Sequence, residues 1–311
     1  MRVVSLASGS SGNALLIEAG PQRRTKLLVD AGLNGRALTD RLQSVGVHPA
    51  QLQGVLVTHE HIDHVAGLPI LMKRYAVPVI ADPLTYKAIE SSLVSGFWRT
   101  DSGALFSSKM EDGEFPSPND DVVRDGLQEG PLKRVLALPV GSKRTVGDIE
   151  VLSFPISHDA VAPCGYLLQA GGCRVCVVTD SGEVTSAMLD MIRQADLLIL
   201  EANHDRERLL RGPYPQALKQ RILSSTGHLS NDQTADAILH TWRPDSVRWL
   251  WLAHLSRTNN TPSLALSSVR ARLLAARANL AQLHLSALSP DMSHVWDSTE
   301  LWRLPFLWDM L

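Results

Sequence analysis

The chain has 311 residues, of which 44% are hydrophobic and 20% charged, with a formal net charge of −2. This length suits one large domain or two small ones, and the charge excludes the overall basicity of many nucleic-acid-binding proteins. The N-terminus lacks the apolar segment of a signal peptide, and no apolar run approaches the ~20 residues of a membrane span. We therefore expect a cytoplasmic protein with no membrane contact.

The first half of the chain predicts strands followed by alternating helices and strands. Short β-rich runs, "RVVSLAS", "NALLIEA" and "TKLLVDAG", are separated by turns rich in Gly, Ser and Asn. A helix is expected at 35–45, then strand "GVLVT", a helix at 65–75, strand "VPVIADP" and helix "PLTYKAIESSL".

Residues 96–131 interrupt this pattern with eight acidic and three basic residues among scattered Gly, Pro and Ser. We interpret this segment as an acidic loop insertion within one domain that spans 1–311. Its net charge of −5 (three basic minus eight acidic residues) would repel a polyanion, so we expect it either to lie beside the substrate path or to be mobile.

The second half repeats the order of strands and then strand–helix units. Strands are expected in "TVGDIEVLSFPIS", "CGYLLQAGG", "CRVCVVTD", "DLLILEA" and "VRWLWLAH", and helices near 184–194, 231–241 and 263–278. This order predicts two β-layers packed face to face with helices outside, an α/β protein. A C-terminal tail runs from about 285 to 311, and its residues 295–311 are rich in aromatic residues. We expect this stretch to dock on the core, with an intersubunit contact as the alternative.

Two of the three cysteines form a C-x-x-C pair, Cys173 and Cys176. A redox or zinc site is one interpretation, and the odd cysteine count argues against a disulfide framework. In a strand, however, positions i and i+3 point to opposite faces, which favours core packing for both. Cys164 is expected to be a small buried residue as well.

The stretch "VTHEHIDHVAGL" concentrates titratable side chains directly after a predicted strand. Its His59 and His61 are two positions apart in a loop, so both rings can reach one ion, and Asp63 and His64 can face a second. Imidazole and carboxylate ligands suit a borderline divalent metal such as zinc or manganese, with iron also possible. A single histidine is more often a structural polar residue, but this spacing favours a metal site.

Further histidines and acids follow the ends of later predicted strands. These are His158 after "VLSFPIS", Asp180 in "CVVTD", Glu201 in "LLILEA" and His254 in "RWLWLAH". Each alone is unremarkable, but together they predict one site at one edge of the sheets.

These motifs resemble the metallo-β-lactamase superfamily, and "SLASGSSGNALLIE", "LLVDAGL", "GHLSN" and "LAHLSRTNN" resemble its YycJ-like (WalJ-like) group. The resemblance covers about residues 1–260 and implies a four-layer αβ/βα sandwich with two divalent metal ions. It implies a first metal held by His59, His61 and His158, a second held by Asp63, His64 and His254, and Asp180 bridging them.

The resemblance also implies catalytic roles. Glu201 and His228 match a Glu–His pair that protonates the leaving oxygen in tRNA-processing relatives, and Asp63 would orient the water. Alternatively, His228 is only a neighbour of a helix N-terminus.

The turn "SGSSGN" could bind phosphate through its backbone and hydroxyl groups, or could be a plain hairpin turn. The candidate substrate contacts are Ser8, Ser10, Ser11, Asn13, His204, Asp205 and Arg206. The basic stretch 206–221 could follow a phosphate backbone, or could be a solvated helix face.

We therefore expect a dinuclear metal-dependent phosphodiesterase that hydrolyses nucleic acid, most simply a DNA exonuclease, through a hydroxide bridging the two metals. The alternatives are a small-molecule phosphodiesterase or thioesterase of the same superfamily, and a regulatory metal-binding module. The sequence does not decide between a monomer and a homodimer.

Overall fold

The computed structural model describes residues 1–100, 105–107, 134–244 and 246–302. Within these residues the strands form two seven-stranded sheets and a separate two-stranded hairpin of β6 (Phe97–Arg99) and β7 (Leu105–Ser107).

The first sheet is built from the N-terminal part of the chain and one late strand, in the order β16-β1-β2-β3-β4-β5-β8. Strands β3, β4, β5 and β8 run parallel, and the other pairings are antiparallel. The bounds are β1 (Arg2–Ala7), β2 (Ala14–Ala19), β3 (Thr25–Val29), β4 (Gly54–Leu56), β5 (Val79–Ala81), β8 (Val135–Ala137) and β16 (Val295–Asp297).

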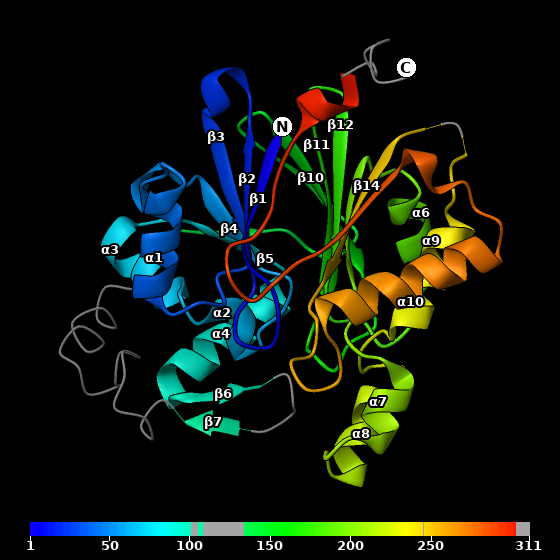
Figure 1. The fold of residues 1–311 in the computed structure, drawn as a ribbon. Coiled ribbons are helices and arrows are strands. Elements are labelled where there is room, and N and C mark those ends of the chain that lie inside the picture. The colour runs from blue at the N-terminus through cyan, green and yellow to red at the C-terminus, as the bar shows by residue number, and fades with distance from the viewer. Residues whose placement is uncertain (101–104, 108–133, 245, 303–311) are drawn as a thin grey trace.

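The second sheet has the order β15-β14-β13-β12-β11-β10-β9, with β12 to β15 parallel and the remaining pairings antiparallel. The bounds are β9 (Lys143–Val146), β10 (Ile149–Pro155), β11 (Cys164–Ala170), β12 (Cys173–Val178), β13 (Leu197–Glu201), β14 (Arg248–Ala253) and β15 (Leu283–Ala287). The two sheets pack face to face in the middle of the molecule (Figure 1).

Helices cover the outer face of each sheet (Figure 1). The first sheet carries α1 (Gly35–Ser44), α3 (Leu68–Tyr75) and α4 (Pro83–Ser95), and the second carries α6 (Ser186–Ile192), α9 (Asn231–His240) and α10 (Pro262–Ala275). Three short helices lie toward one end: α2 (Ile62–Val65), α7 (Arg206–Arg211) and α8 (Gln216–Ile222). Short 3-10 turns are η1 (Pro21–Arg23), η2 (Pro49–Gln51), η3 (Leu280–Gln282) and η4 (Ser298–Trp302).

Three apolar clusters hold the four layers together. Successive strand residues alternate between them: Leu197 and Ile199 pack between the sheets, while Leu198 and Leu200 pack against the outer helices. Because both faces of these strands are buried, their sequences read as continuous apolar runs. The expected αβ/βα sandwich is confirmed.

Details differ from the sequence prediction. The expected helix at 65–75 is divided at Gly67, whose added Cβ would lie 2.7 Å from the Leu33 carbonyl oxygen, and α3 begins at Leu68. The run "TVGDIEVLSFPIS" is a hairpin of β9 and β10 that turns at Gly147, where φ is +56°. Cys173 and Cys176 lie in different apolar clusters on opposite faces of β12, as expected, and burial raises the pKa of each thiol to about 12.

The proposed insertion and tail are only partly described. Strands β6 and β7 lie within 96–131, while residues 101–104 and 108–131 lie outside the described residues. In the tail, β16 pairs with β1, and Trp296 is 2% exposed between the sheets. The division into one domain with an insertion stays a prediction. Among the described residues, no helix combines the length and apolar character needed to cross a lipid bilayer.

Two hydrogen bonds from the second sheet fix the end of β4. The Cys164 amide donates to the Thr58 carbonyl oxygen at 3.0 Å, and the Tyr166 hydroxyl donates to the Val57 carbonyl oxygen at 2.6 Å. Tyr166 is fully buried, and burial raises its pKa well above the usual value, so the hydroxyl remains a donor. The loop that follows β4 is thereby held in register with the second sheet.

Replacing Tyr166 by phenylalanine should lower the free energy of unfolding by about 1–3 kcal/mol, because the buried Val57 carbonyl loses its donor. Urea denaturation followed by circular dichroism measures this change. The matched control is Tyr86→Phe, since the Tyr86 hydroxyl has no hydrogen-bond partner among the described residues. Equal losses in both variants would contradict the proposed link between the sheets.

Candidate metal centre

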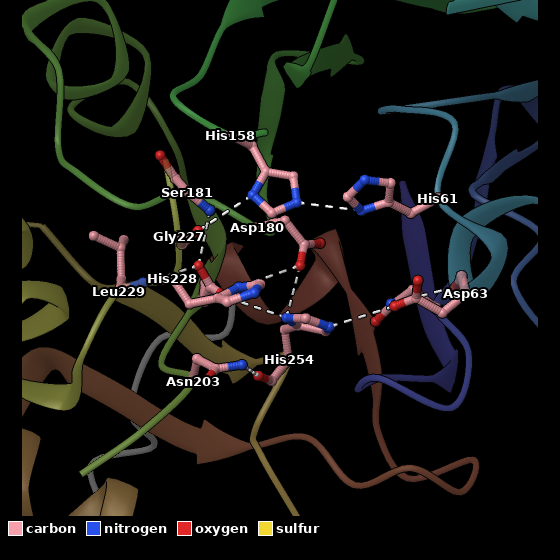
Figure 2. A network of polar contacts seen from close by, with 12 residues as sticks. His61, Asp63, His158, Asp180, Ser181, Asn203, Gly227, His228, Leu229 and His254 are labelled. Atoms are coloured by element: carbon pink, nitrogen blue, oxygen red, sulfur yellow. Dashed lines mark hydrogen bonds and ion pairs between the residues drawn. The ribbon is translucent and has the colours of Figure 1, made fainter. Parts of the chain in front are cut away.

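The candidate site lies where the carboxyl ends of strands from both sheets meet. His59 follows β4 and His158 follows β10, while Asp180, Glu201 and His254 stand at or just beyond the ends of β12, β13 and β14. Ligands commonly bind at this edge of parallel strands. Figure 2 shows the side chains of His158, Asp180 and His254 converging from these strand ends.

The backbone is strained at three of these strand ends. Asp30, Asp180 and His254 have φ of 61°, 55° and 53°, a region that residues other than glycine enter rarely. Such conformations persist where the surroundings over-determine them, and they gather at functional sites. Here they follow β3, β12 and β14, and each turns a titratable side chain toward the same edge.

The first group of donors is His59, His61 and His158, whose ligand atoms lie within 4.8 Å of one another. The Nε2 atom of His158 is 3.4 Å from Nδ1 of His61, and Nδ1 of His158 is 3.2 Å from the Gly227 carbonyl oxygen (Figure 2). Burial holds the pKa of His59 well below its usual value, so this ring is neutral. Its buried Nε2 has no hydrogen-bond partner among the described residues, and its lone pair could coordinate a metal ion.

The second group is Asp63, His64 and His254, again within 4.8 Å of one another. Nε2 of His254 is 3.7 Å from Asp63 Oδ2 (Figure 2). Nδ1 of His64 is 2.8 Å from Asp30 Oδ2, which directs the proton to Nδ1 and leaves Nε2 as the ligand atom. Burial disfavours a charged His64 ring, but Asp30 and Asp180 outweigh it and raise the pKa of this residue.

Asp180 lies between the two groups. With His59 and His64 it forms a further set within 4.8 Å, and its Oδ2 is 3.0 Å from His64 Nε2. Burial would raise the pKa of this carboxyl, but His254 and His64 hold it well below the usual value, so it is ionised. A buried carboxylate flanked by both groups suits a bridge between two ions.

The donor set fits two borderline divalent ions. Imidazole nitrogens and carboxylate oxygens are the ligands of zinc, manganese and iron sites. The structure brings all seven sequence-predicted ligands together at the sheet edge, and the division into two sites stays a proposal.

Glu201 and His228 form a buried pair beside these groups. Nδ1 of His228 is 2.7 Å from Glu201 Oε1, and the Ser181 and Leu229 amides donate to Glu201 Oε2 at 2.8 and 3.1 Å. Burial would raise the pKa of Glu201, but His228 lowers it below the usual value. An ionised Glu201 fixes the orientation of the His228 ring and directs exchange with a substrate to Nε2.

A second grouping competes with the sequence-based assignment. Asp180, Glu201, His228 and His254 also lie within 4.8 Å of one another. Nδ1 of His254 is 2.9 Å from Asp180 Oδ1 and 3.0 Å from Glu201 Oε1. Because a metal-bound histidine usually gives its other N–H to a carboxylate, we assign Nδ1 to these contacts and Nε2 to the ion beside Asp63.

A cavity of about 320 Å³ opens next to the metal-ligand candidates. Asp63 and His228 contribute to its lining, together with Ser10, Ile62, Thr100, Asn203, Tyr214, Leu218, Ile222 and Ser256. The site can therefore admit a small group directly to the proposed acid and one metal ligand.

The predicted substrate contacts in the turn "SGSSGN" differ in exposure. Ser10 and Ser11 are exposed, and Ser10 lines the cavity. Ser8 and Asn13 are buried supports: the His254 amide donates to Ser8 Oγ at 2.9 Å, and the Gly9 amide donates to Asn13 Oδ1 at 2.8 Å. The turn "SGSSGN" thus holds the metal-ligand candidates besides presenting hydroxyls.

His204 does not reach the cavity. It is 0% exposed, and the neighbouring Asn203 lines the cavity, so the expected substrate contact at His204 stays a prediction. Asp205 caps α7 by accepting from the Arg208 amide, and the exposed Arg206 is the first residue of α7. Neither is among the cavity-lining residues.

The sequence interpretation missed three residues. Asp30 ends the run "LLVD" as Asp180 ends "CVVTD", so the same strand-end signal pointed to it. Asn203 donates to the His254 carbonyl oxygen at 3.0 Å (Figure 2). The exposed Arg257 donates to Ser11 Oγ at 2.8 Å and places a positive charge near the turn, a contact between residues too far apart in sequence to predict.

Comparison with known proteins identifies a β-lactamase superfamily domain over residues 25–247. The chain is 36% identical to exodeoxyribonuclease WalJ of Streptococcus pneumoniae serotype 2 (strain D39 / NCTC 7466), covering 84% of this chain and 83% of the relative. It is 36% identical to exodeoxyribonuclease YycJ of Bacillus anthracis, covering 85% and 86%. The metallo-β-lactamase fold protein YhfI from Bacillus subtilis superposes with a TM-score of 0.62 at 15% identity, covering 95% and 98%.

Purified protein should bind about two divalent ions per chain, because seven ligands exceed one tetrahedral site. Asp180→Ala should weaken the binding of both ions, because it removes the proposed bridging carboxylate. Asp30→Asn should weaken binding only of the ion at His64, by about 10–100-fold, because the carboxylate charge that orients the ring is lost.

Asparagine tolerates the positive φ of position 30, so this substitution tests the charge and hydrogen bond rather than the backbone. Metal titration followed by calorimetry and elemental analysis measures both variants. Loss of a single ion in Asp180→Ala would show that the bridge is misassigned.

Proposed function

This chain belongs to the metallo-β-lactamase superfamily and is a metal-dependent hydrolase, and from that premise we propose that it degrades DNA as an exonuclease. The observation that carries the proposal is the Glu201–His228 pair, which stands at the cavity beside the donors for two ions. The two 36% identical relatives, both named as exodeoxyribonucleases, support the same substrate class.

Zinc or manganese, with iron as a further candidate, would be held by the donor groups described above. When bound, two such ions supply Lewis acidity that lowers the pKa of a water and offsets the charge of a phosphate group.

The chain's own residues orient the attacking water and supply the proton for the leaving oxygen. Asp63 borders the cavity and orients the attacking water. This water releases a proton to solvent, and its oxygen forms a bond to phosphorus as the bond to the leaving oxygen breaks. His228 holds a proton at Nε2 and delivers it to that leaving oxygen. Glu201, ionised and held by two amides, keeps the ring in position and stabilises its charged form.

We propose that most basic residues of the stretch 206–221 serve the protein's own structure rather than phosphate binding. Arg208 donates to the Thr258 carbonyl oxygen, Arg211 pairs with Glu207 at 3.3 Å, and Arg221 pairs with Asp159 at 2.6 Å. Arg208 and Arg221 thus attach α7 and α8 to neighbouring loops, whereas the exposed Arg211–Glu207 pair adds little stability. The positive charges that we propose for DNA contact are Arg206 and Arg257.

His228→Ala should reduce cleavage of DNA by about 10²–10⁴-fold, the usual effect of losing a general acid. The same variant should hydrolyse bis-p-nitrophenyl phosphate with a much smaller loss, because p-nitrophenolate leaves without a proton. Its metal content should remain near that of the unmodified protein. Steady-state rates on both substrates and elemental analysis measure the three effects.

The control is His254→Ala, which should lose metal and both activities together because His254 is a proposed ligand. Equal losses on the two substrates for His228→Ala would refute the general-acid role, and loss of a metal ion would support the competing grouping. Undetectable cleavage of single-stranded and duplex DNA and of RNA by fully metallated protein would favour a small-molecule phosphodiesterase or thioesterase.

A further inference from the structure

The lining of the cavity divides by chemistry. Ser10, Asn203 and Ser256 are polar and come from loops that also contact the metal-ligand candidates. The apolar part comes from Ile62 of α2 and from the arm formed by α7 and α8, residues 206–222. Catalysis at phosphorus requires the polar part and gives no reason for the apolar part.

The arm supplies one aromatic ring, Tyr214, together with Leu218 and Ile222. Tyr214 lies in the turn between α7 and α8 and is half-buried, so one part of its side chain is available to the cavity. Figure 1 shows both helices beyond the edge of the sheets. The metal-ligand candidates follow the strand ends at this edge.

Two contacts fix the arm relative to the site: Arg208 donates to the Thr258 carbonyl oxygen at 2.9 Å, and Arg221 pairs with Asp159 next to His158. Within the arm, Lys219 of α8 donates to the Leu210 carbonyl oxygen of α7 at 2.7 Å and joins the two helices. The apolar surface is therefore positioned before any ligand binds, which lowers the entropic cost of binding.

We propose that this apolar surface is a base-binding subsite in which the nucleobase of the terminal nucleotide stacks on Tyr214 while its phosphate lies at Asp63 and His228. The inference rests on the proposed nuclease function and names the feature that the site recognises. Aromatic side chains bind unpaired bases in this sequence-tolerant way.

A volume of about 320 Å³ is at the lower end of the range for small-ligand pockets, so it suits one nucleotide. A base must leave its stack to enter such a pocket. The subsite therefore selects frayed or single-stranded ends and requires a base on the nucleotide that is removed.

The experiment compares a single-stranded oligonucleotide with a second one that carries an abasic tetrahydrofuran residue at each end. The unmodified protein should cleave the first with a kcat/KM about 5–150-fold higher, the usual effect of one base–aromatic stack. Tyr214→Ala should cleave both strands equally, and Tyr214→Phe should retain the preference because it keeps the ring.

The matched control is Leu210→Ala, which removes a 47% exposed apolar side chain from the same arm, outside the cavity lining. It should retain the preference. Equal cleavage of the two strands by the unmodified protein, or a preference that persists in Tyr214→Ala, would overturn the inference and leave the nuclease function intact.

Direct binding separates the two proposals if no strand is cleaved. Calorimetry with metal-loaded protein should show tighter binding of deoxyadenosine monophosphate than of deoxyribose 5-phosphate, and Tyr214→Ala should abolish the difference. Equal affinities in the unmodified protein would refute the base subsite, whereas absence of all nucleic-acid cleavage would refute the nuclease function by itself.

Discussion

The site depends on how the two sheets are aligned at the carboxyl ends of their strands. The bonds from the Cys164 amide and the Tyr166 hydroxyl to the segment just before His59 set this alignment. A shift of one sheet by one residue would move His61 away from His158, which lies 3.4 Å from it on the other sheet. Neither sheet carries a complete donor set, so the metal centre requires the packed sandwich.

A cluster of buried carboxylates and imidazoles is costly without a compensating charge or ligand. Fixed hydrogen bonds reduce this cost: Asp30 bonds to His64, and two backbone amides donate to Glu201. Bound metal ions would offset the remaining negative charge. The positive φ angles at Asp180 and His254 are also unfavourable for the isolated chain. They persist because the surrounding sheets and the arrangement of the ligands hold the backbone in these conformations. The backbone strain and the buried polar groups lower the stability of the fold, and they place the metal-ligand candidates before any ion binds.

The sequence predicted the layered fold and the metal-ligand candidates because both depend on local patterns. Apolar runs predicted the strands, and a His or Asp after each run predicted where donors would lie. Contacts between distant segments were not predictable, since Arg257 meets Ser11 across 246 positions and Tyr214 reaches the cavity from a separate arm. The sequence also could not tell which residue beyond the end of β13 faces the cavity: Asn203 lines it, whereas the neighbouring His204 is buried.

The central claim is that two ions lie between the sheets with Asp180 between them. The most direct measurement is anomalous X-ray diffraction from crystals of the protein reconstituted with zinc or manganese. The account predicts one peak among His59, His61 and His158, and a second among Asp63, His64 and His254, with Asp180 contacting both. A peak enclosed by Asp180, Glu201, His228 and His254 would contradict it, because His228 would then be a ligand and could not serve as the proton donor.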